Sequence, residues 1–168
     1  RGYAEQRYSP LEQVNDGNVT ELSLAWYYDL DYNRGQEATP LVVDGVMYTT
    51  SAWSIVHAID ARNGKQLWTF DPKVAKDKAK HACCDAVNRG VALWNGQVFF
   101  GALDGRLIAL DAKTGSLVWT VQTTAPDSAT YLTGPPWVFN GKVAIGFGGA
   151  DFDMSRGYVT AYDAETGR

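Results

Sequence analysis

The chain repeats itself at an interval of about 51 residues. The segments AIDARNGKQLW and ALDAKTGSLVW place Asp60 and Asp111 at matching positions, and each segment ends in a tryptophan, Trp68 or Trp119. A third copy, AYDAETGR, begins in the same way around Asp163. A fixed period of this length is typical of repeat architectures, in which each repeat forms one structural unit and buries its apolar face against the next.

Each repeat consists of short apolar segments bounded by turn residues. A matching strand pair precedes each copy, at 43–51, 94–102 and 139–147. These segments are rich in β-branched and aromatic residues and predict short β-strands, with a hairpin turn in LDGRL at 103–107. In the Asp-x-x-x-Gly stretches we expect turns in which Asp accepts backbone N–H groups, and the following Trp should pack between sheets. The charged segment 72–82 is compatible with a helical turn, but a charged surface loop is the favoured prediction.

Several short strands per repeat, repeated about three times, predict an all-β fold and an incomplete β-propeller. Propellers have about 4–8 blades of four strands each, and the third copy reaches Arg168 before its expected tryptophan. We therefore expect either a piece of a larger protein or a short chain that closes its ring by self-association through open edges. The whole chain, 1–168, divides into a leading segment with Trp26 and three predicted units, at 1–35, 36–70, 88–121 and 133–168.

Composition excludes several classes of protein. A net charge of −4 without a basic run argues against nucleic acid as a partner. No stretch approaches the roughly 18 apolar residues of a membrane span. The sequence has no haem attachment motif and no glycine-rich dinucleotide motif, so a nicotinamide cofactor is not expected. The chain starts at Arg1 without Met, from which we expect a processed or trimmed product.

The only cysteines, Cys83 and Cys84, are adjacent in HACCDAV. An ordinary disulfide joins Cα atoms about 4.4–6.8 Å apart, whereas neighbouring residues are only about 3.8 Å apart across a trans peptide. Two interpretations follow from the residues alone. Both cysteines are reduced and buried as small hydrophobic residues, or they form a strained eight-membered ring that forces the intervening peptide out of planar trans geometry.

The motifs together resemble the PQQ-dependent alcohol dehydrogenases, the quinoprotein and quinohemoprotein ethanol and methanol dehydrogenases. The resemblance rests on tryptophan-docking repeats such as ALDAKTGSLVW, and on RYSPLEQVN, GQEATP, HACCDAVNRG, GGAD and RGYVTAYDAETG, which occur in family order. It covers nearly the whole chain and implies about the first third of an eight-bladed propeller. The implied enzyme oxidises an alcohol with PQQ and Ca²⁺ and passes electrons to a cytochrome c or haem domain. The disulfide that the family carries implies an oxidising compartment, the periplasm.

The resemblance also implies a set of cofactor-binding residues. In relatives the paired cysteines, here Cys83 and Cys84, lie flat against one face of PQQ. An Arg fork such as that of Arg89 suits the carboxylates and quinone oxygens of PQQ. Taken without the resemblance, Glu37 is consistent with a solvated loop carboxylate, Arg89 with a surface ion pair and Thr133 with a turn hydroxyl. The remaining residues that match family contacts to PQQ are Glu37, Thr133, Gly148, Gly149 and Ala150.

Three positions depart from the family pattern. Asp151 stands where most relatives carry a Glu that binds Ca²⁺, and an Asp is a sound but shorter ligand. Four residues rather than the family's three lie between Asp151 and Arg156, so Asp153 could compete as ligand. Trp137 stands where relatives often carry Arg. The choice of metal is left open.

No catalytic residue is assigned, because the family's catalytic Asp matches no position up to Arg168. We therefore expect the chain alone to have no alcohol dehydrogenase activity. The alternative is a non-catalytic β-propeller scaffold that binds other proteins. The combination of Glu37, Cys83, Cys84 and Arg89 favours the enzyme.

Overall fold

The computed structural model describes residues 9–152 and 154–168 and contains three antiparallel sheets. The first and second sheets have four strands each, and the third has three within these residues, in the order β11-β10-β9. The expectation of four strands is therefore met in two of the three repeats. The strands are β1 (Leu41–Val43), β2 (Val46–Ser51), β3 (Ile55–Asp60), β4 (Gln66–Phe70), β5 (Ala92–Trp94), β6 (Gln97–Gly101), β7 (Arg106–Asp111), β8 (Leu117–Gln122), β9 (Trp137–Phe139), β10 (Lys142–Gly146) and β11 (Val159–Asp163).

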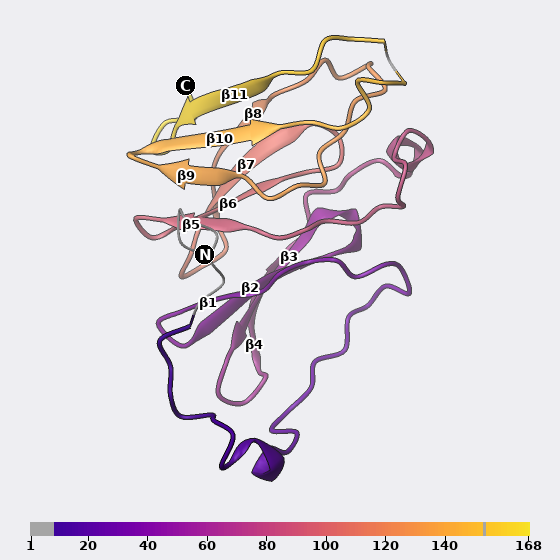
Figure 1. Cartoon of the computed structure of the whole chain (residues 1–168). Helices are drawn as coiled ribbons and strands as arrows, with labels where there is room; N and C mark the ends of the chain where they lie inside the picture. Colours follow the sequence, from indigo (N-terminus) through magenta and orange to yellow (C-terminus); the bar gives the residue numbers. More distant parts are fainter. Residues whose placement is uncertain (1–8, 153) are drawn as a thin grey trace.

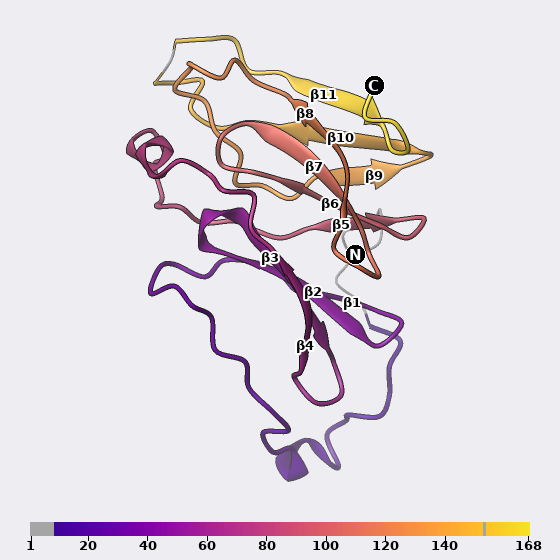
Figure 2. The ribbon, with the colours of Figure 1, turned by 180° about the vertical axis from the view of Figure 1, so that it is seen from behind.

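The sheets follow one another in space in the order of the chain. Figure 1 shows the purple first sheet below, the pink second sheet in the middle and the orange and yellow third sheet above, and Figure 2 shows the same order from behind. Residues 9–35 of the leading segment lie on the side of the first sheet that faces away from the second. The chain is all-β and forms part of a β-propeller, as predicted.

Tight hairpins connect the first two strands of each sheet. The central residues of these turns are Asp-Gly or Asn-Gly pairs, and both residues have positive φ, from 45° to 77°. This conformation defines the type I′ turn, which Asn-Gly and Asp-Gly favour because its twist matches that of the strands. The hairpin predicted at 103–107 is also present, between β6 and β7, with Gly105 at φ 87°. In the first two sheets a bulge recurs at equivalent positions, after Ala58 and after Ala109.

A tryptophan from each unit docks on the turn of the next unit. The indole N–H groups each donate a 3.0 Å hydrogen bond to the carbonyl oxygen of the alanine that follows the turn Asp. The glycine of each turn has φ of 72–73°, and a Cβ there would lie 2.7–2.9 Å from the indole ring. The prediction that the tryptophans after the turns pack between sheets is confirmed for Trp68 and Trp119, and Trp26 docks the leading segment on the first sheet in the same way. The pairs are Trp26 with Ala61, Trp68 with Ala112, and Trp119 with Ala164.

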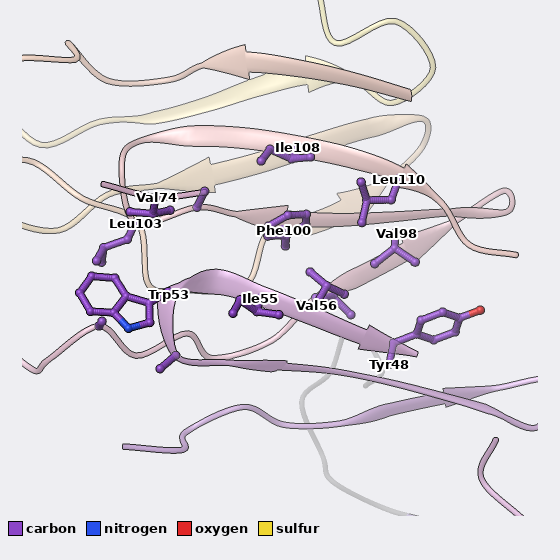
Figure 3. Close-up of a cluster of buried hydrophobic side chains, with 14 of the residues drawn as sticks. Tyr48, Trp53, Ile55, Val56, Val74, Val98, Phe100, Leu103, Ile108 and Leu110 are labelled. Carbon is purple, nitrogen blue, oxygen red and sulfur yellow. The ribbon is translucent and has the colours of Figure 1, made fainter. Parts of the chain in front are cut away.

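Two hydrophobic clusters hold the sheets together. One lies between the first and second sheets, where side chains of β2 and β3 meet those of β6 and β7 (Figure 3). The other lies between the second and third sheets and includes Phe99, Leu107, Leu132 and Val143. Complete burial of one such side chain stabilises the fold by about 1.5–3 kcal/mol, so the packing between sheets stabilises the fold.

The connection between the first and second sheets contains a short helical turn. Segment 72–82, predicted as a surface loop, includes the 3-10 helix η3 (Lys76–Lys80). Ala79 and Ala82 pack against the core, which favours this turn over an extended loop. Two further 3-10 turns are η1 (Val19–Glu21) and η2 (Ala52–Ser54). None of the helices in the described residues has the length and apolar character needed to cross a membrane.

Candidate functional site

Three predicted residues, each located just before the first strand of one sheet, contact one another. Glu37 precedes β1, Arg89 precedes β5 and Thr133 precedes β9. The Arg89 guanidinium lies 2.7 Å from the Glu37 carboxylate and donates a 2.6 Å hydrogen bond to Thr133 Oγ1. The side chains of Arg89 and Glu37 are 39% and 40% exposed, so a ligand can reach this group. The arrangement joins a cation, a carboxylate and a hydroxyl from three different repeats.

Main-chain hydrogen bonds fix Arg89 at the centre of this group. Its N–H donates to the Thr133 carbonyl at 2.8 Å, and its carbonyl accepts from Thr39 N at 3.3 Å. Gly90 has φ of 122°, and a Cβ there would lie 3.1 Å from the Thr39 carbonyl oxygen. The backbone around Arg89 is therefore bonded to the first and third sheets at the same time.

Asn88 supports this backbone from within the protein and was not singled out from the sequence. It is 1% exposed, and its Nδ2 donates to the Gly101 carbonyl at 2.8 Å while its Oδ1 accepts from Gly90 N at 3.0 Å. A buried amide with both ends satisfied stabilises one local conformation. The only sequence signal is its place directly before Arg89 in NRG.

Cys83 and Cys84 form a disulfide, so the interpretation as two reduced, buried thiols is wrong. Both residues are exposed and lie between η3 and β5. Their Cα atoms are 3.8 Å apart, and none of the peptide bonds between the described residues is cis. The disulfide is exposed to solvent on the segment that leads to Arg89.

The glycines of GFGGAD have partners within the chain itself. Gly148 pairs with Tyr131 through two backbone hydrogen bonds, and a Cβ on Gly148 would lie 2.7 Å from the Tyr131 ring. Gly149 has φ of 89°, and its Cβ would lie 2.7 Å from the Ala129 carbonyl oxygen. Internal packing thus requires both glycines, whatever ligand approaches them. Ala150 is half-buried in the turn that follows.

A pocket of about 610 Å³ connects part of the predicted set. Its lining includes Arg89, Thr133 and Gly148, and Trp137 forms another part of the wall. Trp137, noted above as a departure from the family pattern, is 45% exposed on β9. Its indole therefore lies where an incoming ligand or another part of the protein would meet it.

Asp151 belongs to no metal-binding group among the described residues. It is exposed in the turn after β10. Among residues 9–152 and 154–168, no three acidic, histidine or cysteine side chains gather as a metal-binding group. The competing candidate, Asp153, lies outside the described residues. The residues present do not by themselves make a calcium site.

Comparison with known proteins gives a consistent result along the whole chain. Residues 1–168 match the PQQ family described as the glucose/ethanol/alcohol dehydrogenase beta-propeller domain. The quinohemoprotein alcohol dehydrogenase ADH IIB of Pseudomonas putida is 61% identical over 168 residues, which is all of this chain and 24% of the relative. The 1-butanol dehydrogenase (cytochrome c) of Thauera butanivorans is 59% identical over 161 residues, 95% of this chain and 23% of the relative.

Solved structures agree with these matches. The quinohemoprotein alcohol dehydrogenase ADHIIG from Pseudomonas putida superposes with a TM-score of 0.95 at 60% identity, covering 99% of this chain and 24% of that protein. The chain therefore spans about a quarter of the length of these relatives, rather than the expected third.

Proposed function

The chain belongs to the PQQ β-propeller family of glucose, ethanol and alcohol dehydrogenases, and we propose that it forms the first part of a periplasmic enzyme that oxidises an alcohol with PQQ and passes the electrons to a cytochrome c or a haem domain. The observation that carries the proposal is the convergence of Glu37, Arg89 and Thr133, in a chain that also has an exposed disulfide five residues before Arg89. A scaffold propeller would have no use for this combination. The predicted units 36–70, 88–121 and 133–168 are proposed as its first three blades.

The residues present fit a flat, polyanionic cofactor. The half-exposed Arg89 guanidinium suits planar carboxylates, since its donors form a rigid fork. The exposed Cys83–Cys84 ring offers a compact, polarizable sulfur surface for stacking. Glu37, Thr133 and the backbone around Gly148, Gly149 and Ala150 would complete one wall of the site. When bound, PQQ supplies a two-electron acceptor for alcohol oxidation.

In this proposal the chain's own residues bind and orient rather than transfer protons. Arg89 neutralises the negative charge of the cofactor and is held in place by Glu37 and Thr133. Ca²⁺, if bound, would take an oxygen ligand from Asp151. The described residues hold no cluster of three acidic, histidine or cysteine side chains that would complete its site. The family's catalytic Asp has no match here, so we propose that residues 1–168 alone do not oxidise alcohols.

The test is PQQ binding and dye-linked alcohol oxidation by the whole protein. Arg89→Lys keeps the charge but removes the fork, and it should weaken PQQ binding by roughly tenfold, since a hydrogen bond to a charged group contributes about 1.5–3 kcal/mol. Arg62→Lys, which changes an exposed ion pair with Asp60 in a docking turn, is the control and should bind PQQ normally. The proposal fails if the parent protein does not bind PQQ, or if Arg89→Lys binds as tightly as the control.

A further inference from the structure

Two ion pairs of opposite polarity join the segment before β1 to the segment that follows the disulfide. Arg34 NH1 lies 2.6 Å from Asp85 Oδ1, and Arg89 NH2 lies 2.7 Å from Glu37 Oε2. Segment 34–37 thus contributes a cation and then an anion, and segment 85–89 contributes an anion and then a cation. A shift that exchanged partners would place like charges together. The two pairs therefore favour one alignment of the segments.

Asp85 directly follows the disulfide and adopts an unusual backbone conformation. Its φ is 69°, in the left-handed region where Asp is one of the few tolerated residues other than glycine. The backbone N–H of Ala86, the Arg34 guanidinium and the backbone N–H of Gly35 all lower the pKa of the Asp85 carboxyl. One carboxylate therefore stabilises both the turn after Cys84 and its contact with the opposite segment.

Trp53 supports the other partner of this pair. The Arg34 guanidinium lies 5.5 Å from the indole centroid, and Lys76 Nζ of η3 lies 3.7 Å from it. The indole is 5% exposed and lies at the edge of the core between the first two sheets (Figure 3). The backbone N–H of Trp53 donates a 2.9 Å hydrogen bond to the Ala86 carbonyl. A rigid core residue thus contacts Arg34 with its ring and the turn after Asp85 with its backbone.

We propose that Arg34 and Asp85 are positioning residues for the Cys83–Cys84 ring. Their ion pair, seated on Trp53, fixes the exposed sulfur ring relative to Glu37 and Arg89. The ring itself is on the surface, and without this pair the turn after Cys84 loses its ion pair with the opposite charged segment. The inference rests on the proposed function only where it assigns the ring to the wall of a PQQ site.

The experiment measures how fast dithiothreitol opens the ring in the intact protein without PQQ. The thiols formed are trapped with iodoacetamide and counted by mass spectrometry. Asp85→Asn keeps the shape and the left-handed tolerance of the residue while it removes the charge, and Arg34→Gln removes the other partner. Arg34→Lys restores the charge. Arg62→Gln, which breaks the 2.8 Å pair with Asp60 in a docking turn, is the matched control.

In Asp85→Asn and Arg34→Gln we expect the ring to open roughly fivefold faster than in the parent. A fivefold change corresponds to about 1 kcal/mol, the upper value for the stabilisation by an exposed ion pair. Arg34→Lys should fall between them and the parent, and the control should match the parent. PQQ affinity should fall in the same two variants while their melting temperatures stay equal to that of the control. Equal opening rates in Asp85→Asn, Arg34→Gln and the control would overturn the inference, as would faster opening that only follows a lowered melting temperature. Failure of the parent to bind PQQ would instead refute the proposed function and leave the opening rates to decide this inference.

Discussion

Replacing Gly115 with alanine tests the contact that joins the first sheet to the second. Gly115 lies in the turn after β7, has φ of 73°, and a Cβ there would lie 2.7 Å from ring atoms of Trp68 on β4. Gly96, in the hairpin between β5 and β6, provides a matched control. Its φ is 74°, but a Cβ at that position would have nothing within 4 Å. The two substitutions therefore share the backbone cost and differ in the collision with the indole.

The expected difference follows from these contacts. Placing alanine in the left-handed region costs about 1–2 kcal/mol at either position. Only Gly115→Ala also displaces the indole, which adds about 1–3 kcal/mol for overpacking and weakens the 3.0 Å hydrogen bond from Trp68 to Ala112, worth about 1 kcal/mol. We expect Gly115→Ala to reduce the free energy of unfolding by about 2–4 kcal/mol more than Gly96→Ala.

Urea unfolding of the 168-residue chain, followed by far-UV circular dichroism, gives the free energy of unfolding of each variant. The slope against urea should stay constant, since neither change alters the surface exposed on unfolding. Exchange of the Trp68 indole proton should accelerate in Gly115→Ala and not in Gly96→Ala. Equal destabilisation by the two substitutions would refute the claim that the docked indole, rather than the turn conformation alone, requires this glycine.

Three other predictions concern docking and pH. Trp119→Phe should reduce the free energy of unfolding by about 1 kcal/mol more than Trp68→Phe, because the carbonyl that accepts from Trp68 also accepts from Tyr48 at 3.1 Å; equal losses would contradict this. Burial lowers the pKa of His57 below its usual 6.5. The unfolded state therefore binds more protons, and the free energy of unfolding should fall as pH drops below 6.5. In urea unfolding at pH 5 and pH 7.5, His57→Gln should show a smaller difference in this free energy than the parent. Hydrogen bonds from Arg62 lower the pKa of Asp60 from 3.8 to about 2. The stabilisation that the ionised Asp60 gives the folded state is therefore present above pH 3.8 and is lost as pH falls towards 2. An acid unfolding curve that Asp60→Asn leaves unchanged would contradict this.

The regular parts of the fold were predictable because their signals are local. Positive φ in the Asp-Gly and Asn-Gly hairpins follows from the residues at the turn. The docking tryptophans follow from the repeat, because each unit presents the same donor to the same carbonyl of the next unit. The helical turn at Lys76–Lys80 was only the less favoured alternative from the sequence, since its stability comes from packing against the core rather than from its charged residues.

The candidate site was predictable only through resemblance to a family. The residues around Glu37, Arg89 and Thr133 in the sequence do not predict their contact, because each of the three is also a common loop or turn residue. The role of Gly148 also differs from the simplest expectation, since the Tyr131 ring already accounts for the absence of a side chain there. Arg34 and Asp85 gave no signal in the sequence.

The sequence by itself determined the repeat, the hairpins, the order of the sheets and the adjacency of the two cysteines, because these depend on residues close together in the chain. Only the tertiary structure decided which side chains share a surface. Arg89 contacts Glu37 and Thr133, and Asp85 contacts Arg34, because stacking the sheets through their buried apolar faces brings the entrances of successive repeats together. That stacking acts between units about 50 residues apart, a separation at which local sequence patterns carry no information about contact.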